Sequence, residues 1–257
     1  MRYTVSVALK DLVSYCNDYL SVERFKDYCP NGLQVEGKRD ISKIVSGVTA
    51  SQALIDAAVE VGADLLLVHH GYFWKGEAEP LTGIKGNRIR TLMKNDISLL
   101  AYHLPLDAHP EVGNNAQLAK IIGIHIEDGM DQGNPLSVGN VGSISQPMSA
   151  TAFSDLVSEK LNRPAELVVG DDRTVKRVAW CTGSAERMIE RADQLGADLF
   201  ISGEISEPVV HYAREAGIHY LSAGHHATER YGAKALGEHL SVTFGIEHQF
   251  VDIDNPA

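Results

Sequence analysis

The sequence contains little cysteine, and its cysteines do not form a zinc-binding pattern. Cys16, Cys29 and Cys181 are scattered over 257 residues, without any Cys-x-x-Cys pair. This small, odd number argues against a disulfide framework and against a zinc site built from thiolates, and it suits a reducing compartment. We therefore expect a cytoplasmic protein.

Long apolar runs, basic clusters and phosphate-binding loops are also missing. No segment reaches the roughly 18 consecutive apolar residues of a membrane span, and charge appears too early in the chain for a secretory signal peptide. Acidic residues outnumber basic residues by 34 to 23, which gives a net charge of −11. Proteins that bind nucleic acid normally carry a positive face. We expect neither a membrane nor nucleic acid as the main partner.

Two segments of the chain resemble each other and predict its fold. Residues 44–68 and 178–202 each contain a strand, a Ser or Thr helix cap, apolar residues at helical spacing, a glycine stop and a second strand. Both carry Gly-Ala-Asp before the second strand, and a third strand follows at 97–102 and at 218–223. This pattern predicts an α/β fold of two similar lobes related by an internal repeat.

The repeat also predicts where the functional site lies. We place the first lobe at 1–127 and the second at 128–257, with a connection rich in Gly, Asn, Ser and Pro at 129–147. Open α/β sheets bind ligands at the carboxyl ends of their strands, and pockets favour the space between lobes. We expect a metal site in the cleft between the two lobes.

Adjacent histidines end the apolar strand of the first lobe. The run Asp64-Leu-Leu-Leu-Val68 is typical of a buried strand and continues into His69, His70 and Gly71. Because neighbouring side chains on a strand point in different directions, two imidazoles serve two partners more naturally than they chelate one ion. By themselves, they fit equally well as one buried and one exposed histidine before a tight turn.

Further ligand-type residues follow the equivalent strands. Asp107 precedes a helix expected over 116–122, which Asn114 or Asn115 would cap. His225 and Glu229 are four residues apart and share one face of a helix that begins near His225. The adjacent histidine at position 226 is an alternative that the spacing leaves open.

Together these residues supply three imidazoles and two carboxylates, and no sulfur. Such donors suit zinc, iron, manganese, cobalt or nickel. Five ligands exceed the roughly four of a structural zinc site and suit two divalent ions about 3.5–4 Å apart, which acidify a water for hydrolysis. The alternative interpretation is a set of unconnected core and surface histidines. The set comprises His69, His70, Asp107, His225 and Glu229.

Four ordered motifs in the chain resemble the Nif-three-like dinuclear metal-centre family, whose members often carry the label GTP cyclohydrolase one, type two. The motifs are Asn31-Gly-Leu-Gln-Val35, His69-His-Gly71, Tyr102-His-Leu-Pro-Leu-Asp107 with Gly113-Asn-Asn115, and Gly224-His225 with Thr228-Glu229. The resemblance implies the same five ligands, with His225 preferred over the next histidine and Glu229 bridging. It places His70 and Asp107 on one metal, and His69 and His225 on the other.

The resemblance also implies a paired α/β fold, a toroidal homohexamer and opening of the guanine imidazole ring of GTP or action on a related nucleotide. We expect His103 and Glu204, which end strands near the predicted site, to move protons in such a reaction. The alternative function is a non-catalytic metal-binding ring that acts as a regulator or as a scaffold for partners. The missing phosphate loop favours that alternative.

Overall fold

The structure, a computed structural model, describes residues 5–257 and confirms the predicted α/β class. Within this range, no helix has the length and apolar character needed to cross a membrane. The chain divides into two compact units, which are described separately. The first contains the described residues up to Leu106 together with 232–254, and the second contains 107–231 and 255–257.

The bounds of these units differ from those of the lobes at 1–127 and 128–257. The chain passes between the units more than once, because α4 (Leu104–Ala108) and α9 (His225–Phe244) each have residues in both. Lobes with the bounds expected from the sequence stay a prediction.

The first unit is built on a five-stranded sheet in the order β13-β4-β5-β6-β2. Strands β13, β4, β5 and β6 run parallel, and β2 is antiparallel at one edge. Its elements are β1 (Val7–Ala8), α1 (Leu9–Tyr19), the 3₁₀ helix η1 (Val22–Arg24), β2 (Gly32–Val35), β3 (Asp40–Ile41), β4 (Lys43–Thr49), α2 (Gln52–Glu60), β5 (Leu65–His70), α3 (Gly83–Lys94), β6 (Ser98–Ala101) and β13 (Glu247–Phe250).

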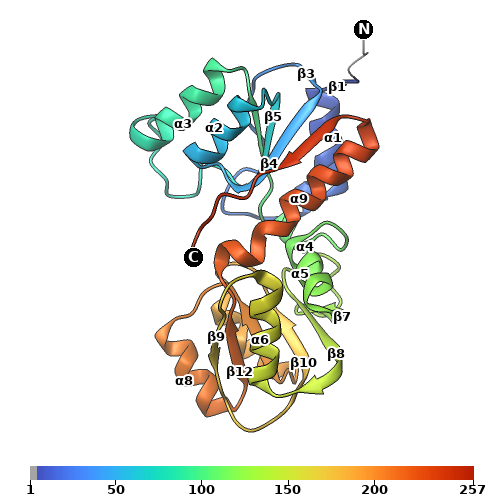
Figure 1. Ribbon diagram of the computed structural model, residues 1–257, viewed down its shortest axis with the longest axis vertical. Coiled ribbons are helices and arrows are strands. Elements are labelled where there is room, and N and C mark those ends of the chain that lie inside the picture. The colour runs from blue at the N-terminus through green and yellow to red at the C-terminus, as the bar shows by residue number, and fades with distance from the viewer. Residues whose placement is uncertain (1–4) are drawn as a thin grey trace. The chain divides into compact units, whose positions relative to one another are not determined.

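Helices cover both faces of this sheet, and its central strands β4, β5 and β6 are largely buried. Figure 1 shows α2 and α3 on one side, and α1 with the C-terminal part of α9 on the other. Val45, Leu66 and Leu99 are register partners on β4, β5 and β6, and they are fully buried in a cluster with residues of α2 and α3. The continuous run of β5 is therefore a strand buried on both faces, as its sequence predicts.

The second unit contains a six-stranded sheet in the order β7-β8-β10-β11-β12-β9. Strands β10, β11 and β12 are parallel, and the outer strands pair antiparallel. Its elements are α5 (Asn114–Ile122), β7 (Ile124–Gly129), β8 (Asn140–Met148), α6 (Ala150–Leu161), β9 (Glu166–Val168), β10 (Val175–Trp180), the 3₁₀ helix η2 (Glu186–Met188), α7 (Ile189–Gln194), β11 (Leu199–Ser202), α8 (Glu207–Ala216) and β12 (His219–Ser222).

Two apolar layers enclose this second sheet. Phe153 of α6 and Leu118 of α5 pack with Trp180 on one face. Ile189 of α7 and Val209 of α8 pack with other strand residues on the opposite face. Both units therefore contain a parallel β-α-β-α-β core with an antiparallel strand beside its third parallel strand.

The Gly-Ala-Asp sequence shared by the two segments has one structural role in both units. Asp64 Oδ2 accepts hydrogen bonds from the backbone N–H groups of residues 42 and 43, at 2.9 and 3.1 Å. Asp198 Oδ2 accepts from those of residues 176 and 177, at 2.9 and 2.7 Å. Each aspartate thus ties the turn before one strand to the start of its neighbour.

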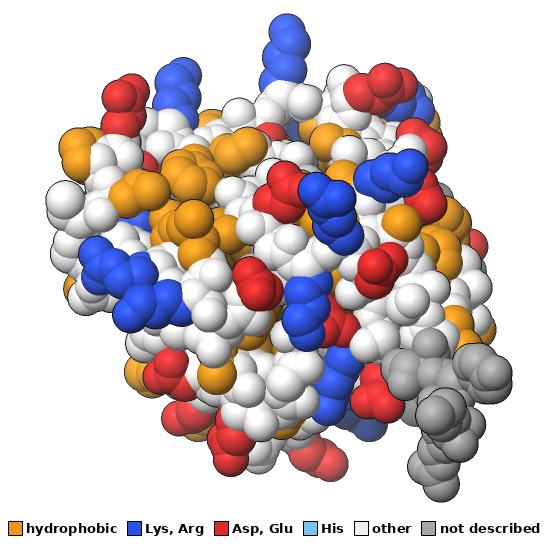
Figure 2. Space-filling view, turned by 90° about the horizontal axis from the view of Figure 1, so that it is seen from above, with side chains coloured by type: hydrophobic (Ala, Val, Ile, Leu, Met, Phe, Trp, Pro, Cys, Tyr) orange, Lys and Arg blue, Asp and Glu red, His pale blue; other side chains and the backbone are white. Residues whose placement is uncertain are grey.

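Charged side chains of both signs are interspersed on the face drawn in Figure 2. Hydrophobic side chains also reach this surface, and basic side chains form no separate field on the face that the figure draws.

Candidate metal-binding residues

His69 lies at the carboxyl end of β5 and is fully buried. Its Nδ1 is 2.9 Å from the backbone carbonyl oxygen of Tyr102. Because a carbonyl can only accept, Nδ1 carries the proton, and Nε2 is the nitrogen with a lone pair. Histidines that bind metals are commonly oriented in this way, by a hydrogen bond from the other ring nitrogen.

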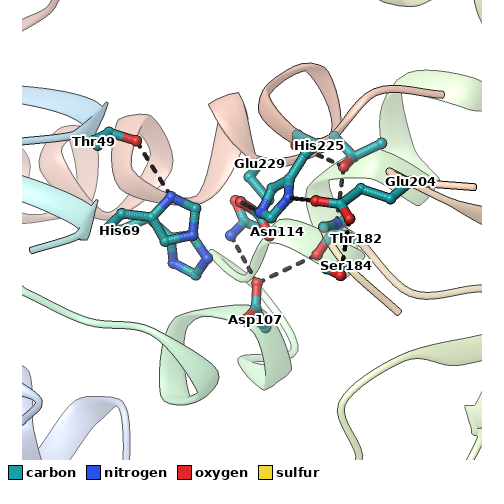
Figure 3. A network of polar contacts seen from close by, with 12 residues as sticks. Thr49, His69, Asp107, Asn114, Thr182, Ser184, Glu204, His225 and Glu229 are labelled. Carbon is teal, nitrogen blue, oxygen red and sulfur yellow. Dashed lines mark hydrogen bonds and ion pairs between the residues drawn. The ribbon is translucent and has the colours of Figure 1, made fainter. Parts of the chain in front are cut away.

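His70 is the next residue and is only half-buried. Thr49 of β4 is the register partner of His70 in the sheet. Thr49 Oγ1 lies 3.3 Å from His70 Nδ1. Figure 3 labels Thr49 and the neighbouring His69. Gly71 then turns the chain away. A Cβ at that glycine would lie 2.2 Å from Gln34 Oε1 and 2.6 Å from the Ala101 side chain, so a larger residue does not fit there.

His103 follows β6 and contacts an aspartate that sequence reasoning missed. Its Nδ1 is 2.7 Å from Asp27 Oδ1. Its backbone N–H donates to Asn31 Oδ1 at 2.7 Å. The sequence motif that begins at Asn31 indicated that residues near this position belong to the site, but Asp27 lies outside the motif.

Asp27 is a well-organised carboxylate. Its two oxygens also accept hydrogen bonds from the backbone of Tyr28, the side chain of Asn31 and the backbone of Leu104, at 2.6, 2.9 and 2.9 Å. Burial alone would raise the pKa of Asp27, but the hydrogen bonds from His103 and Asn31 outweigh it and lower the pKa to about 2. The carboxylate is ionised at neutral pH and orients the His103 ring.

Three of the histidines in the first unit form one group. One ring nitrogen from each of His69, His70 and His103 lies within 4.8 Å of the others. The rings of His69 and His70 have centroids 4.5 Å apart at an interplanar angle of 45°. Three imidazoles at this separation can supply nitrogen ligands to a divalent ion.

In the second unit, α9 begins at His225, as the spacing required. His225 Nε2 lies 3.1 Å from Glu229 Oε2, one helical turn along, and Nδ1 lies 2.6 Å from Glu204 Oε1. Figure 3 shows the ring between these two carboxylates. Glu204 follows β11 and lies next to the predicted ligand His225. Its position at the end of a strand had suggested this proximity.

The two carboxylates determine the charge of His225. Burial alone would lower the pKa of His225, but hydrogen bonding and charge attraction from Glu229 and then Glu204 raise it to about 9. Without a metal the ring is therefore an imidazolium, and a metal ion that binds Nε2 must displace a proton.

Asp107 is buried and held by side chains of its own unit. Asn114 Nδ2 and Thr182 Oγ1 donate to Asp107 Oδ1 at 2.9 and 3.3 Å, and Asn115 Nδ2 donates to its backbone carbonyl at 3.2 Å. The expectation that Asn114 or Asn115 caps a helix over 116–122 is wrong. Helix α5 begins at Asn114 with Gly113 in the cap position, and both amides orient Asp107 instead.

A glycine makes room beside the carboxylate of Glu229. A Cβ on Gly183 would lie 2.0 Å from Glu229 Oε1 and 3.2 Å from His225 Nε2. Thr228 Oγ1 accepts a hydrogen bond from the Gly183 backbone N–H at 3.1 Å and so holds the Gly183 backbone close to Glu229. His226, the alternative ligand, is buried and donates its own N–H to the Ala257 carbonyl at 3.1 Å.

One feature is common to the four histidines at strand ends. Each has its Nδ1 within hydrogen-bond distance of a protein oxygen. The pairs are His69 with Tyr102, His70 with Thr49, His103 with Asp27, and His225 with Glu204. A metal ion that leaves these four contacts intact would bind each ring through Nε2. The donor set of imidazoles and carboxylates in each unit fits a divalent transition metal.

The fold and these residues define an α/β protein with histidine and carboxylate groups that could hold metal ions. A family model, Duf34/NIF3 (NGG1p interacting factor 3), matches residues 7–256, and the chain belongs to this family.

Curated relatives and solved structures agree with this assignment. A Pseudomonas aeruginosa protein named "GTP cyclohydrolase 1 type 2 homolog" is 54% identical over 253 residues, covering 98% of this chain and 100% of the relative. An Allochromatium vinosum protein of the same name is 54% identical over 257 residues, covering 98% and 99%. The solved structure of protein ybgI, described as of unknown function, is 46% identical with a TM-score of 0.94, covering 98% and 100%. A Thermus thermophilus protein of solved structure, TTHA1606, is 36% identical with a TM-score of 0.88, covering 98% and 100%.

Proposed function

We propose that this chain holds two divalent metal ions and uses them in hydrolysis. The ligands in this proposal are His69, His70, Asp107, His225 and Glu229. The observation that carries it is the shared orientation of the histidines, each with Nδ1 on a protein oxygen, the arrangement by which proteins orient metal-binding imidazoles.

The assignment of the five ligands to the two ions follows the family resemblance. His70 and Asp107 would bind mainly one ion, His69 and His225 the other, and Glu229 would bridge. The contacts of His225 with Glu204 and Glu229 support its choice over the neighbouring histidine. The ions would be zinc, iron, manganese, cobalt or nickel, since nitrogen and oxygen donors do not discriminate among them.

Bound divalent ions would acidify water and stabilise the negative charge that develops on a substrate. The protein's own contribution is proton transfer and orientation. His103 is held by Asp27 and can exchange a proton with substrate through Nε2. Glu204 keeps His225 oriented, and its second carboxylate oxygen accepts from Ser184 Oγ at 3.1 Å.

The substrate that we propose is a small molecule, with a nucleotide as the first to test. The names of the curated relatives point to GTP, whose guanine imidazole ring would be opened. The family resemblance also leads us to propose a toroidal homohexamer, which sedimentation analysis of the purified chain would test by its mass.

The test compares wild type with Asp107→Ala and Glu229→Ala, and with His211→Ala as a control for an exposed histidine. Elemental analysis of each protein measures bound metal, and turnover is measured with GTP and a panel of nucleotides after metal loading. We expect about two ions per chain at the dinuclear centre and turnover in wild type and the control. The two alanine variants should lose turnover and the metal bound at this centre. Equal metal content in all four proteins would remove the proposed centre.

The same experiment identifies the non-catalytic alternative. If the predicted ligands bind metal but no nucleotide of the panel is turned over, the proposed metal centre would be supported and the proposed hydrolase activity would be rejected. The chain would then act as a metal-binding ring that regulates or assembles partners.

A further inference from the structure

A cysteine lies beside the histidine group of the first unit. Asp27, Cys29 and His103 each offer a ligand atom, and these three atoms all lie within 4.8 Å of one another. No sequence pattern indicates this group, because the cysteines have no metal-binding spacing and the histidine comes from a distant strand end. None of the five ligands proposed above belongs to it.

Cys29 differs from the other two cysteines in its accessibility. Cys16 and Cys181 are buried, with 0% and 3% of their surface exposed, whereas Cys29 is half-buried. It lies in the segment between η1 and β2. An ion arriving from solvent can therefore reach this sulfur without an opening of the core.

The surroundings of Cys29 favour a cation. Burial and then the negative charge of Asp27 raise the pKa of the Cys29 thiol to about 12. Asp27 is ionised and only 3% of its side chain is exposed, so its charge is poorly screened. A divalent ion placed here would remove the repulsion between thiolate and carboxylate and would bind both.

We propose that Asp27, Cys29 and His103 form a further metal site for a borderline or soft divalent ion of the Zn²⁺ class. Sulfur, nitrogen and oxygen ligands together favour such ions over Mg²⁺ or Ca²⁺. The ion would take the place of the proton on His103 Nδ1, the neutral ring would then carry its proton on Nε2, and the Cys29 thiol would release its proton to solvent.

The site acts on the residue that we expect to move protons. A metal on His103 Nδ1 would replace the Asp27 hydrogen bond that orients the ring. Occupation of the site would then reduce proton transfer by His103 while leaving the five ligands of the proposed dinuclear centre in place. The site itself depends only on the first unit and stands whether or not the dinuclear centre exists.

Cobalt substitution in the full-length chain tests the proposal directly. Metal-free wild type, Cys29→Ser, Asp27→Asn and Asp107→Ala are titrated with Co²⁺ and followed by absorption. A thiolate bound to Co²⁺ produces an intense near-ultraviolet charge-transfer band that imidazole and carboxylate ligands do not produce. We expect the band in wild type and Asp107→Ala, its loss in Cys29→Ser, and its weakening in Asp27→Asn.

Two results would overturn the site. One is a wild-type protein saturated with Co²⁺ that shows no thiolate band. The other is a band of equal intensity in Cys29→Ser, which would assign the sulfur to another cysteine. A second measurement does not need the variants. At an alkaline pH where Cys29 of the metal-free protein is alkylated by iodoacetamide, as mapped by mass spectrometry, Zn²⁺ should slow this labelling, and an equal rate of labelling with Zn²⁺ would contradict the proposal.

Discussion

Glu204 Oε1 lies 2.6 Å from His225 Nδ1, so a residue outside the proposed ligand set orients one of its members. We predict that Glu204→Gln lowers metal affinity about 10- to 100-fold, the usual effect of losing such a partner. The side chain is 47% exposed, so the fold should be unaffected. Competition with a chelator of known affinity measures the loss.

Glu207→Gln is the matched control for this change. Glu207 also pairs with a histidine, His211, at 3.2 Å, but both side chains are exposed on α8. This variant should bind metal as wild type does. Equal affinities in the two glutamine variants would show that Glu204 does not support His225 as a ligand.

Asp27→Asn should separate catalysis from metal binding. The carboxylate accepts from His103 and from three other donors, and an amide can accept at only one of its two positions. We predict a loss of about 1–3 kcal/mol in the free energy of unfolding from the unsatisfied donors. Turnover should fall by more than the folded fraction does, with the two ions of the dinuclear centre retained.

Denaturant unfolding, elemental analysis and turnover on the same preparation measure these three quantities. Asp18→Asn, an exposed aspartate of α1, is the control and should match wild type in all of them. Normal turnover in Asp27→Asn would exclude His103 from proton transfer in the form proposed here.

The elements of the repeat could be predicted from the sequence because local patterns determine them. The run ending at His69 is long and apolar enough to be a doubly buried strand, and it is β5. The His225–Glu229 spacing needed only a helix that begins at the histidine, and α9 begins there. In both cases a few residues close together in the sequence are enough to predict the element.

The residues that support the site could not be predicted in the same way. Asp27 lies in the segment between η1 and β2 and meets His103, which follows β6. Glu204 follows β11 and meets His225, which follows β12. Both contacts depend on the fold, which brings segments that are distant in sequence together. The expected cap at Asn114 is wrong because Gly113 takes that position and the Asn114 amide bonds to a buried carboxylate. Such tertiary contacts leave no periodic pattern along the chain.

Asp64→Asn should lower stability in a pH-dependent way. Burial opposes ionisation, but hydrogen bonds and charge from Lys38 and Ser42 lower the pKa of Asp64 below its ordinary value. A lowered pKa means that the stabilisation is complete above about pH 4, the unfolded value, and is lost as the pH falls through the folded value. At pH 7 we expect the variant to be about 1–3 kcal/mol less stable.

Thermal or urea unfolding from pH 7 to pH 3 checks this prediction. The difference between wild type and Asp64→Asn should shrink as the pH falls below about 4, because the Asp64 carboxyl of the unfolded chain takes up a proton at a higher pH than that of the folded protein. Asp56→Asn, which alters an exposed aspartate of α2, should follow the wild-type curve. A constant difference at every pH would show that the charge of Asp64 does not contribute.

Gly183→Ala should abolish metal binding at the proposed dinuclear centre by adding one methyl group. Gly183 and Gly196 both have φ of 69°, so alanine at either position costs a similar amount of backbone strain, roughly 1–2 kcal/mol. Only at Gly183 would the new Cβ meet Glu229 and His225, since nothing lies within 4 Å of it at Gly196. Both variants should therefore melt below wild type, Gly183→Ala at the lower temperature because of the added contact with buried Glu229, and Gly183→Ala alone should lose the metal of the dinuclear centre in elemental analysis. Retention of wild-type metal content by Gly183→Ala would mean that Glu229 and His225 do not need this space to bind an ion.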